Sequence, residues 1–205
     1  MAYLLGIKVE YISIYPLGGI SHFKMPLNIK PIKELLILIM GPIFQIIAYL
    51  ILIELLPDNK NLIEYYHWHI LFFNLLPIIP LDGGKLLLLF IQKIIPYYYS
   101  YKLLIVTSII ISISILIINK ININIIITII LLVILMIKEY KKIDIIYQKF
   151  LLERYLNNYI FKRKRIITNE KYFYRNLNHI IKLGDKYYLE KDYLRKKYEK
   201  NKKSY

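Results

Sequence analysis

The chain has 205 residues, of which 57% are hydrophobic, and a formal net charge of +15. Soluble domains are about 45–50% apolar, and here the apolar residues lie in long uncharged runs, so the composition excludes an ordinary soluble globular protein. The chain has no cysteine, which excludes a disulfide framework and a thiolate metal site.

The first 33 residues are expected to form the end of a helix that stops at Gly6, followed by a β-hairpin. Residues 9–15 are β-branched and aromatic, and Pro16-Leu-Gly18-Gly19 favours a turn before a second short strand ending near residue 23. Open strand edges cannot face lipid. The hairpin is therefore expected at the membrane interface or packed against helices.

Four hydrophobic segments follow, at residues 35–53, 65–91, 103–119 and 121–137. Each is long enough to cross a bilayer, and the second is interrupted by prolines and glycines near its middle. Only residues 119–120 separate the last two segments, which predicts a tight antiparallel hairpin. The sequence therefore predicts an all-α polytopic membrane protein with about four transmembrane helices, one of them broken.

The distribution of Lys and Arg gives the expected orientation and domain boundaries. From residue 138 onward there are 20 Lys and Arg against 8 Asp and Glu, a surplus of about 12 positive charges. By the positive-inside rule, the N-terminus, the loop after the second segment and this tail are predicted to be cytoplasmic in a multi-pass protein of the cell membrane. The expected units are residues 1–33, a transmembrane core at 34–138 and a basic tail at 139–205.

Within the tail, residues 141–160 are expected to form an amphipathic helix. Short strands are predicted around 166–167 and 172–174, and a hairpin over 180–188 with its turn at Gly184-Asp185. The Lys-rich end is expected to be disordered. The cluster Lys162-Arg-Lys-Arg165 could bind nucleic acid or anionic lipid, and the lipid interpretation is favoured beside membrane spans, so no nucleic-acid partner is predicted.

Asp82 is the polar residue of greatest interest because it lies inside a hydrophobic segment. A carboxylate in mid-bilayer costs about 2.5–3.5 kcal/mol and usually has a functional partner. Pro77 and Pro80 remove backbone donors beside it, and Gly83-Gly84 permit tight backbone turns. A carboxylate on such a broken helix could hold a cation. A solvated loop at the membrane surface remains an alternative, since Asp-Gly is common in turns.

The stretch Asn74-Leu-Leu-Pro77-Ile-Ile-Pro80-Leu-Asp82-Gly83-Gly84 resembles the NPDG motif of the site-2 protease family of intramembrane zinc metalloproteases, peptidase family M50. Three further elements stand in the family's order: the Gly-rich β element at Gly18-Gly19, Met40-Gly41-Pro42 in the middle core helix, and Phe150-Leu-Leu-Glu153-Arg154-Tyr155, which resembles the juxtamembrane segment of the stage IV sporulation protein FB type. The resemblance covers residues 1 to about 155.

The resemblance implies a role for each matched residue. Asp82 would be a zinc ligand, Asn74 would hydrogen-bond near the substrate or oxyanion, and Pro77 and Gly83 would shape the loop. Family members bind zinc with the two histidines of an HExxH helix, whose glutamate is the general base, and with the Asp as third ligand. The implied substrate is a membrane-associated regulatory precursor, such as a sporulation sigma factor, with membrane regulatory proteins as further partners.

This sequence contains no HExxH. Residues 1–6 read like the continuation of the catalytic helix, so the motif is expected just before Met1. Among the histidines, His67 and His69 are expected at the membrane interface, His22 is a weaker candidate ligand and His179 lies in the tail. A catalytically inactive scaffold therefore remains an alternative to the protease. A cation transporter is a further alternative, but it would favour an internal repeat of the broken helix, which the other segments lack.

Overall fold

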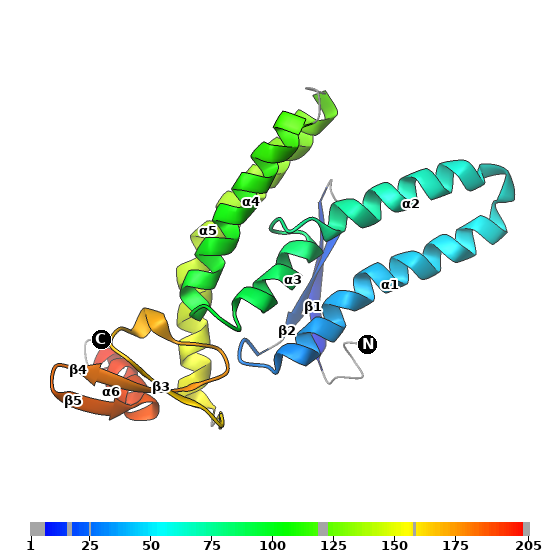
Figure 1. Cartoon of the computed structure of the whole chain (residues 1–205). Helices are drawn as coiled ribbons and strands as arrows, with labels where there is room; N and C mark the ends of the chain where they lie inside the picture. Colours follow the sequence, from blue (N-terminus) through cyan, green and yellow to red (C-terminus); the bar gives the residue numbers. More distant parts are fainter. Residues whose placement is uncertain (1–6, 16–17, 25, 119–122, 158, 203–205) are drawn as a thin grey trace.

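The computed structural model describes residues 7–15, 18–24, 26–118, 123–157 and 159–202. Most of these residues are helical, which confirms the predicted all-α polytopic membrane fold (Figure 1). The expected end of a helix at residues 1–6 lies outside the described residues.

The elements follow in a simple order. The N-terminal hairpin consists of β1 (Lys8–Tyr15) and β2 (Gly18–Lys24), paired antiparallel as predicted. The membrane helices are α1 (Pro31–Leu55), α2 (Lys60–Leu75), α3 (Asp82–Ile91), α4 (Tyr97–Ile118) and α5 (Ile123–Leu156), with a short 3-10 turn η2 (Pro57–Asn59) between α1 and α2. The tail contains β3 (Lys164–Ile167), η3 (Glu170–Tyr172), β4 (Asn178–Leu183), β5 (Lys186–Leu189) and α6 (Glu190–Lys202).

Three of the helices, α1, α4 and α5, are long and apolar enough to cross a membrane. The second predicted span differs from the other three because it forms two helices, α2 and α3, separated at residues 76–81. Pro77 and Pro80 lack the backbone N–H that a continuous helix needs, which explains the break. By contrast, α1 continues through Pro42.

The fourth span and the amphipathic tail helix were predicted as separate elements, but they form one helix, α5. Its 34 residues correspond to about 51 Å of helix, whereas the hydrocarbon core of a bilayer is about 30 Å thick. The last turns of α5 therefore extend beyond the bilayer to the tail. The helix continues past residue 138, the expected boundary between the transmembrane core and the tail.

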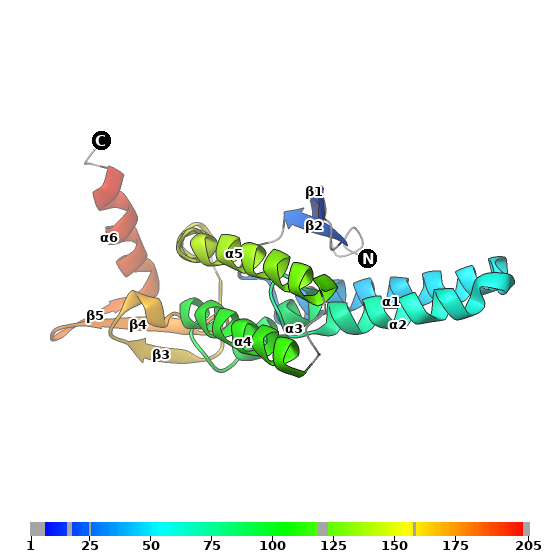
Figure 2. The ribbon, with the colours of Figure 1, turned by 90° about the horizontal axis from the view of Figure 1, so that it is seen from above.

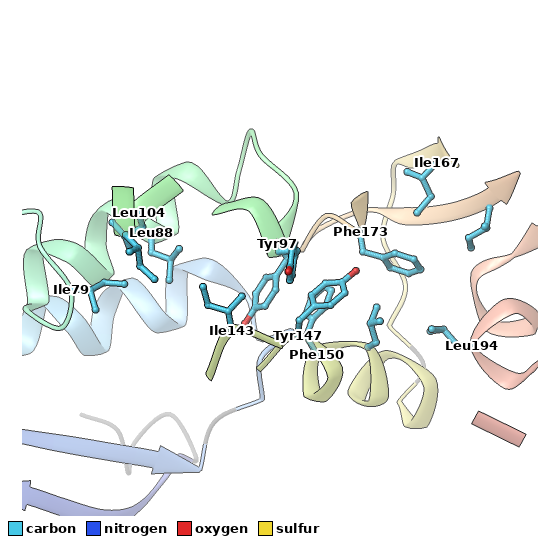
Figure 3. Close-up of a cluster of buried hydrophobic side chains, with 14 residues drawn as sticks. Ile79, Leu88, Tyr97, Leu104, Ile143, Tyr147, Phe150, Ile167, Phe173 and Leu194 are labelled. Carbon is cyan, nitrogen blue, oxygen red and sulfur yellow. The ribbon is translucent and has the colours of Figure 1, made fainter. Parts of the chain in front are cut away.

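The two long hairpins, α1–α2 and α4–α5, diverge from a common base that also holds α3 and the tail (Figures 1 and 2). Along the fully described helix α1 no residue is buried, which suits a helix that faces lipid. The packed core lies at the base. It runs from Ile79 and Leu88 through Tyr97 and Phe150 to Leu194 of α6 (Figure 3).

The tail is a folded unit, with β3 and β4 parallel and β4 and β5 antiparallel. The hairpin turn at Gly184-Asp185 is confirmed, and Gly184 adopts a φ of 59° there, a left-handed conformation that suits glycine. Two predictions were wrong. Tyr172 ends a 3-10 helix where a strand was predicted, and the Lys-rich end forms α6 because its Leu194 side chain packs, fully buried, into the core.

Arg154 fixes this tail to the base. Its buried guanidinium donates to the Asn28 side chain, to backbone carbonyls between Tyr174 and Leu177, and to the Glu190 carboxylate at the start of α6. The neighbouring Glu153 accepts the backbone N–H groups of residues 27 and 28 at 3.1 and 3.2 Å.

Arg175 makes a second set of contacts between the tail and the helices. It donates to Gln92 Oε1 after α3 at 2.9 Å, to the carbonyl of Ile29 and to the carboxylate of Glu34 in α1. The start of α1, the end of α3 and the tail therefore lie at one end of the molecule. This arrangement is the one that the Lys and Arg distribution predicts, and the cytoplasmic location of that end stays a prediction.

His179 lies beside Glu190, the carboxylate that also pairs with Arg154. Burial lowers the pKa of His179, outweighing the Glu190 carboxylate, which acts in the opposite direction. The geometry agrees with a neutral ring, since Nε2 accepts the backbone N–H of Tyr174 at 2.9 Å and Nδ1 lies 2.9 Å from Glu190 Oε2, to which it can donate. His179 is thus a structural residue of the tail.

Candidate functional site

The break between α2 and α3 is a compact turn held by its own backbone. Leu76 N–H donates to the carbonyl of Phe73, and Leu81 N–H donates to the carbonyl of Ile78. Irregular backbone at membrane depth requires such internal partners. Ile78 is fully buried, so the turn is packed within the protein.

Gly83 and Gly84 are required by the close approach of α3 to this turn. A Cβ on Gly83 would lie 2.1 Å from the carbonyl oxygen of Leu75, and one on Gly84 would lie 2.5 Å from the carbonyl oxygen of Ile78. Both distances are far below van der Waals contact, so no residue larger than glycine fits without moving the backbone. The two glycines of the motif therefore press the start of α3 against the end of α2.

Asp82 is the first residue of α3, and its carboxylate faces the middle of α1. A Cβ on Gly41 would lie 3.2 Å from Asp82 Oδ2, so the missing side chain of Gly41 leaves room for this carboxylate. Gly41 lies ten residues after the start of α1, or about 15 Å along a helix that spans a core of about 30 Å. This depth favours the interpretation of Asp82 as an embedded carboxylate over a surface loop.

Lys85 is the partner of Asp82 in the structure. Its Nζ lies 3.0 Å from Asp82 Oδ1, one helical turn along α3, and the two side chains are 37% and 32% exposed. Lys85 was not among the residues predicted to form the site. The i, i+3 spacing was a signal that could have identified it, because such residues share a helix face.

Ser108 joins the break to α4. Its Oγ accepts the buried backbone N–H of Ile79 at 3.1 Å and donates to the carbonyl of Leu104 at 2.7 Å. This role of Ser108 could not be predicted, because α4 has several hydroxyl residues and its uniformly apolar pattern does not show which of them faces the break.

Replacement of Ser108 by Ala is expected to destabilise the protein by about 1–3 kcal/mol, because the N–H of Ile79 would stay buried without an acceptor. Denaturant unfolding of the detergent-solubilised chain measures this change. Ser114→Ala is the matched control, because Ser114 also bonds to the carbonyl four residues earlier but is exposed, so its loss should cost less than about 0.5 kcal/mol. Equal effects of the two changes would contradict the role of Ser108.

The other motif residues lie around this turn or in the hairpin. Asn74 is half-buried in the last turn of α2, next to the carbonyl that Gly83 approaches. Pro77 and Pro80 lie within the turn, and Pro42 lies in α1 beside Gly41. Gly18 and Gly19 begin β2, where they pair with residues 15 and 14.

The histidines of α2 are engaged in helix packing. His67 is buried and stacks on Tyr49 of α1 with ring centroids 4.0 Å apart, and His69 Nδ1 lies 2.7 Å from the carbonyl of Tyr65 in its own helix. Since α2 begins at Lys60, His67 lies in the middle of a helix and not at the start of a span as expected. The expected position of these two histidines at the membrane interface stays a prediction.

Zinc does not fit the described residues on their own. A catalytic zinc takes three protein ligands, and among the residues that the structure describes no three His, Cys, Asp or Glu side chains lie close enough together to hold a metal. Asp82 is a single carboxylate whose Oδ1 is paired with Lys85.

A mostly apolar cavity of about 380 Å³ opens beside the break. Its walls come from Leu76 and Ile78 of the turn, from Ser112 of α4 and from Thr128 of α5. The cavity lies between α2 and the α4–α5 hairpin, so it adjoins the turn that carries the motif prolines.

Among known proteins, the chain is similar to stage IV sporulation protein FB of Bacillus subtilis. The two are 31% identical over 159 residues, which cover 72% of this chain and 55% of the relative. The chain thus spans about half the length of the curated relative that it matches. No family model matches the chain.

This similarity agrees with the resemblance that the motif residues carry. The relative carries the name of the branch to which the juxtamembrane segment pointed. That segment has a definite structural role here, since Glu153 and Arg154 tie the end of α5 to residues 27 and 28 and to the tail.

Proposed function

We propose that this chain functions in intramembrane proteolysis of the site-2 type, as part of a zinc endopeptidase that cleaves a membrane-associated regulatory precursor such as a sporulation sigma factor. The observation that carries the proposal is the position of Asp82. Asp82 is the first residue of the short helix α3, and its carboxylate lies against Gly41 in the middle of α1. Gly83 and Gly84 pack so closely on the preceding turn that no larger residue fits, and this packing fixes the position of Asp82.

Two further features support this function. Asp82 lies in the first turn of α3, where a negative charge interacts favourably with the helix dipole. The apolar cavity beside the break offers room for an extended segment of a membrane protein close to the motif. In this function Asp82 is the metal ligand from α3 and Asn74 orients the substrate.

The test replaces Asp82 by Asn in the protein as it is expressed from its own gene in its native cells. Native expression is needed because the described residues do not include the other zinc ligands. Cleavage of a co-expressed membrane-tethered precursor is expected to fall by at least ~100-fold, since loss of even an outer-shell partner of a metal ligand costs about 10–100-fold. Asp58→Asn, an exposed carboxylate in the turn η2 between α1 and α2, is the matched control and should cleave normally. Full cleavage by the Asp82 variant would contradict the proposal.

A catalytically inactive scaffold is the second candidate. It is favoured by the ammonium of Lys85 on Asp82 and by the lack of a three-ligand cluster among the described residues. It predicts that the purified wild-type protein contains less than stoichiometric zinc by elemental analysis and still binds the precursor without cutting it. Stoichiometric zinc that is lost in Asp82→Asn would exclude this candidate.

A further inference from the structure

A second cavity, of about 700 Å³, lies where the tail meets the helices. One wall is the connection between α3 and α4 at residues 92–94, and the others are the segments 160–165 and 174–177 of the tail. The walls are fixed relative to each other, because Arg175 of the tail donates to Gln92 at 2.9 Å. This cavity is separate from the break that carries Asp82.

The cavity is strongly positive. Five of its lining residues are basic, and none is acidic; the basic residues are Lys93, Lys162, Arg163, Lys164 and Arg165. Among the residues that the structure describes, none of these five forms an ion pair with a carboxylate. Like charges gathered around one cavity repel one another, and an anion bound between them would relieve that repulsion.

Apolar side chains border the same cavity. Ile94 is 78% exposed and Ile160 is 92% exposed, and both line it. The spanning helix α4 begins at Tyr97, three residues after Ile94, so this rim lies where a membrane helix leaves the bilayer. Exposed apolar residues beside clustered cations are typical of a protein surface that contacts the headgroups and upper acyl chains of anionic lipids.

We propose that this cavity binds the phosphate headgroup of an anionic phospholipid from the adjoining leaflet. The phosphate lies among the cations of residues 162–165 and Lys93, and the acyl chains leave the cavity over Ile94 and Ile160. Arg165 also stacks on Tyr174, 4.4 Å from the ring centroid, which holds its side chain at the cavity wall. The bound lipid would hold the tail against the membrane. This inference does not depend on the proposed protease function.

The test measures binding of short-chain lipids to the purified full chain in a neutral detergent. Dioctanoyl phosphatidylglycerol is expected to bind with one site per chain, and dioctanoyl phosphatidylcholine at least ~10-fold more weakly. The double variant R163Q and K164Q should weaken phosphatidylglycerol binding by at least ~10-fold, since each basic residue near anionic lipid contributes about a factor of five. The matched control, K182Q and K186Q on the exposed β4–β5 hairpin, removes the same charge away from the cavity and should change binding by less than ~2-fold.

A further variant separates a lipid from free phosphate. Ile160→Gln changes a side chain that is almost fully exposed, so the fold should be unaffected, and it should weaken the lipid but not inorganic phosphate. The proposal would be overturned if inorganic phosphate bound to the cavity as tightly as the lipid. It would also be overturned if the two charge variants weakened lipid binding equally. Binding of a single-stranded RNA that is lost in the R163Q and K164Q variant while lipid binding persists would overturn it as well.

Discussion

Replacement of Arg154 by Met is expected to release the tail from the membrane helices. The Arg154 side chain is 1% exposed and pairs with Glu190, so its removal leaves this carboxylate without its cationic partner and several backbone carbonyls without their donor. Breaking a buried ion pair from one side costs about 3–5 kcal/mol. Amide hydrogen exchange should show this loss of protection over residues 164–199, while α4 remains protected.

Arg195→Met is the matched control for this change. Arg195 also pairs with a glutamate, Glu199, but the two side chains are 67% and 52% exposed. Such exposed pairs contribute less than about 1 kcal/mol, so exchange in the tail should hardly change. Unchanged protection in the Arg154 variant would show that the apolar core alone, around Phe173 and Leu194, holds the tail in place.

Replacement of Gly83 by Ala is expected to disrupt the break between α2 and α3. The new Cβ would lie 2.1 Å from the carbonyl oxygen of Leu75 and 2.4 Å from that of Leu76, so backbone must move. Overpacking of this kind costs about 1–3 kcal/mol or more. Because the chain has no cysteine, a single Ile78→Cys marker reports the change by maleimide labelling, since Ile78 is fully buried when the turn is intact.

Gly184→Ala separates the effect of the clash from the general effect of losing a glycine. A Cβ at Gly184 meets nothing within 4 Å, and the cost comes only from its φ of 59°, about 1–2 kcal/mol in the exposed β4–β5 turn. Position 78 should therefore stay protected from the label in this variant. A protected position 78 in the Gly83 variant would mean that the turn tolerates a side chain there.

Local signals in the sequence located most elements. The uncharged runs predicted α1, α4 and the membrane part of α5, and Pro77 to Gly84 predicted the break. Gly184-Asp185 predicted its hairpin. The failures came where tertiary contacts override local composition. The helix α6 forms on a Lys-rich segment because Leu194 packs into the core, and residues 172–174 contribute Phe173 to that core without forming a strand.

The sequence by itself determined that this is a polytopic membrane protein and that Asp82 follows a break in a hydrophobic segment. Only the tertiary structure decided what surrounds that carboxylate and the tail. Gly41 faces Asp82, Ser108 supports the turn, and Arg154 and Arg175 join the tail to the start of α1. The physical reason is that these contacts join residues far apart in the chain, and runs of Ile and Leu bury equally well in many helix orientations, so composition leaves the facing side undetermined.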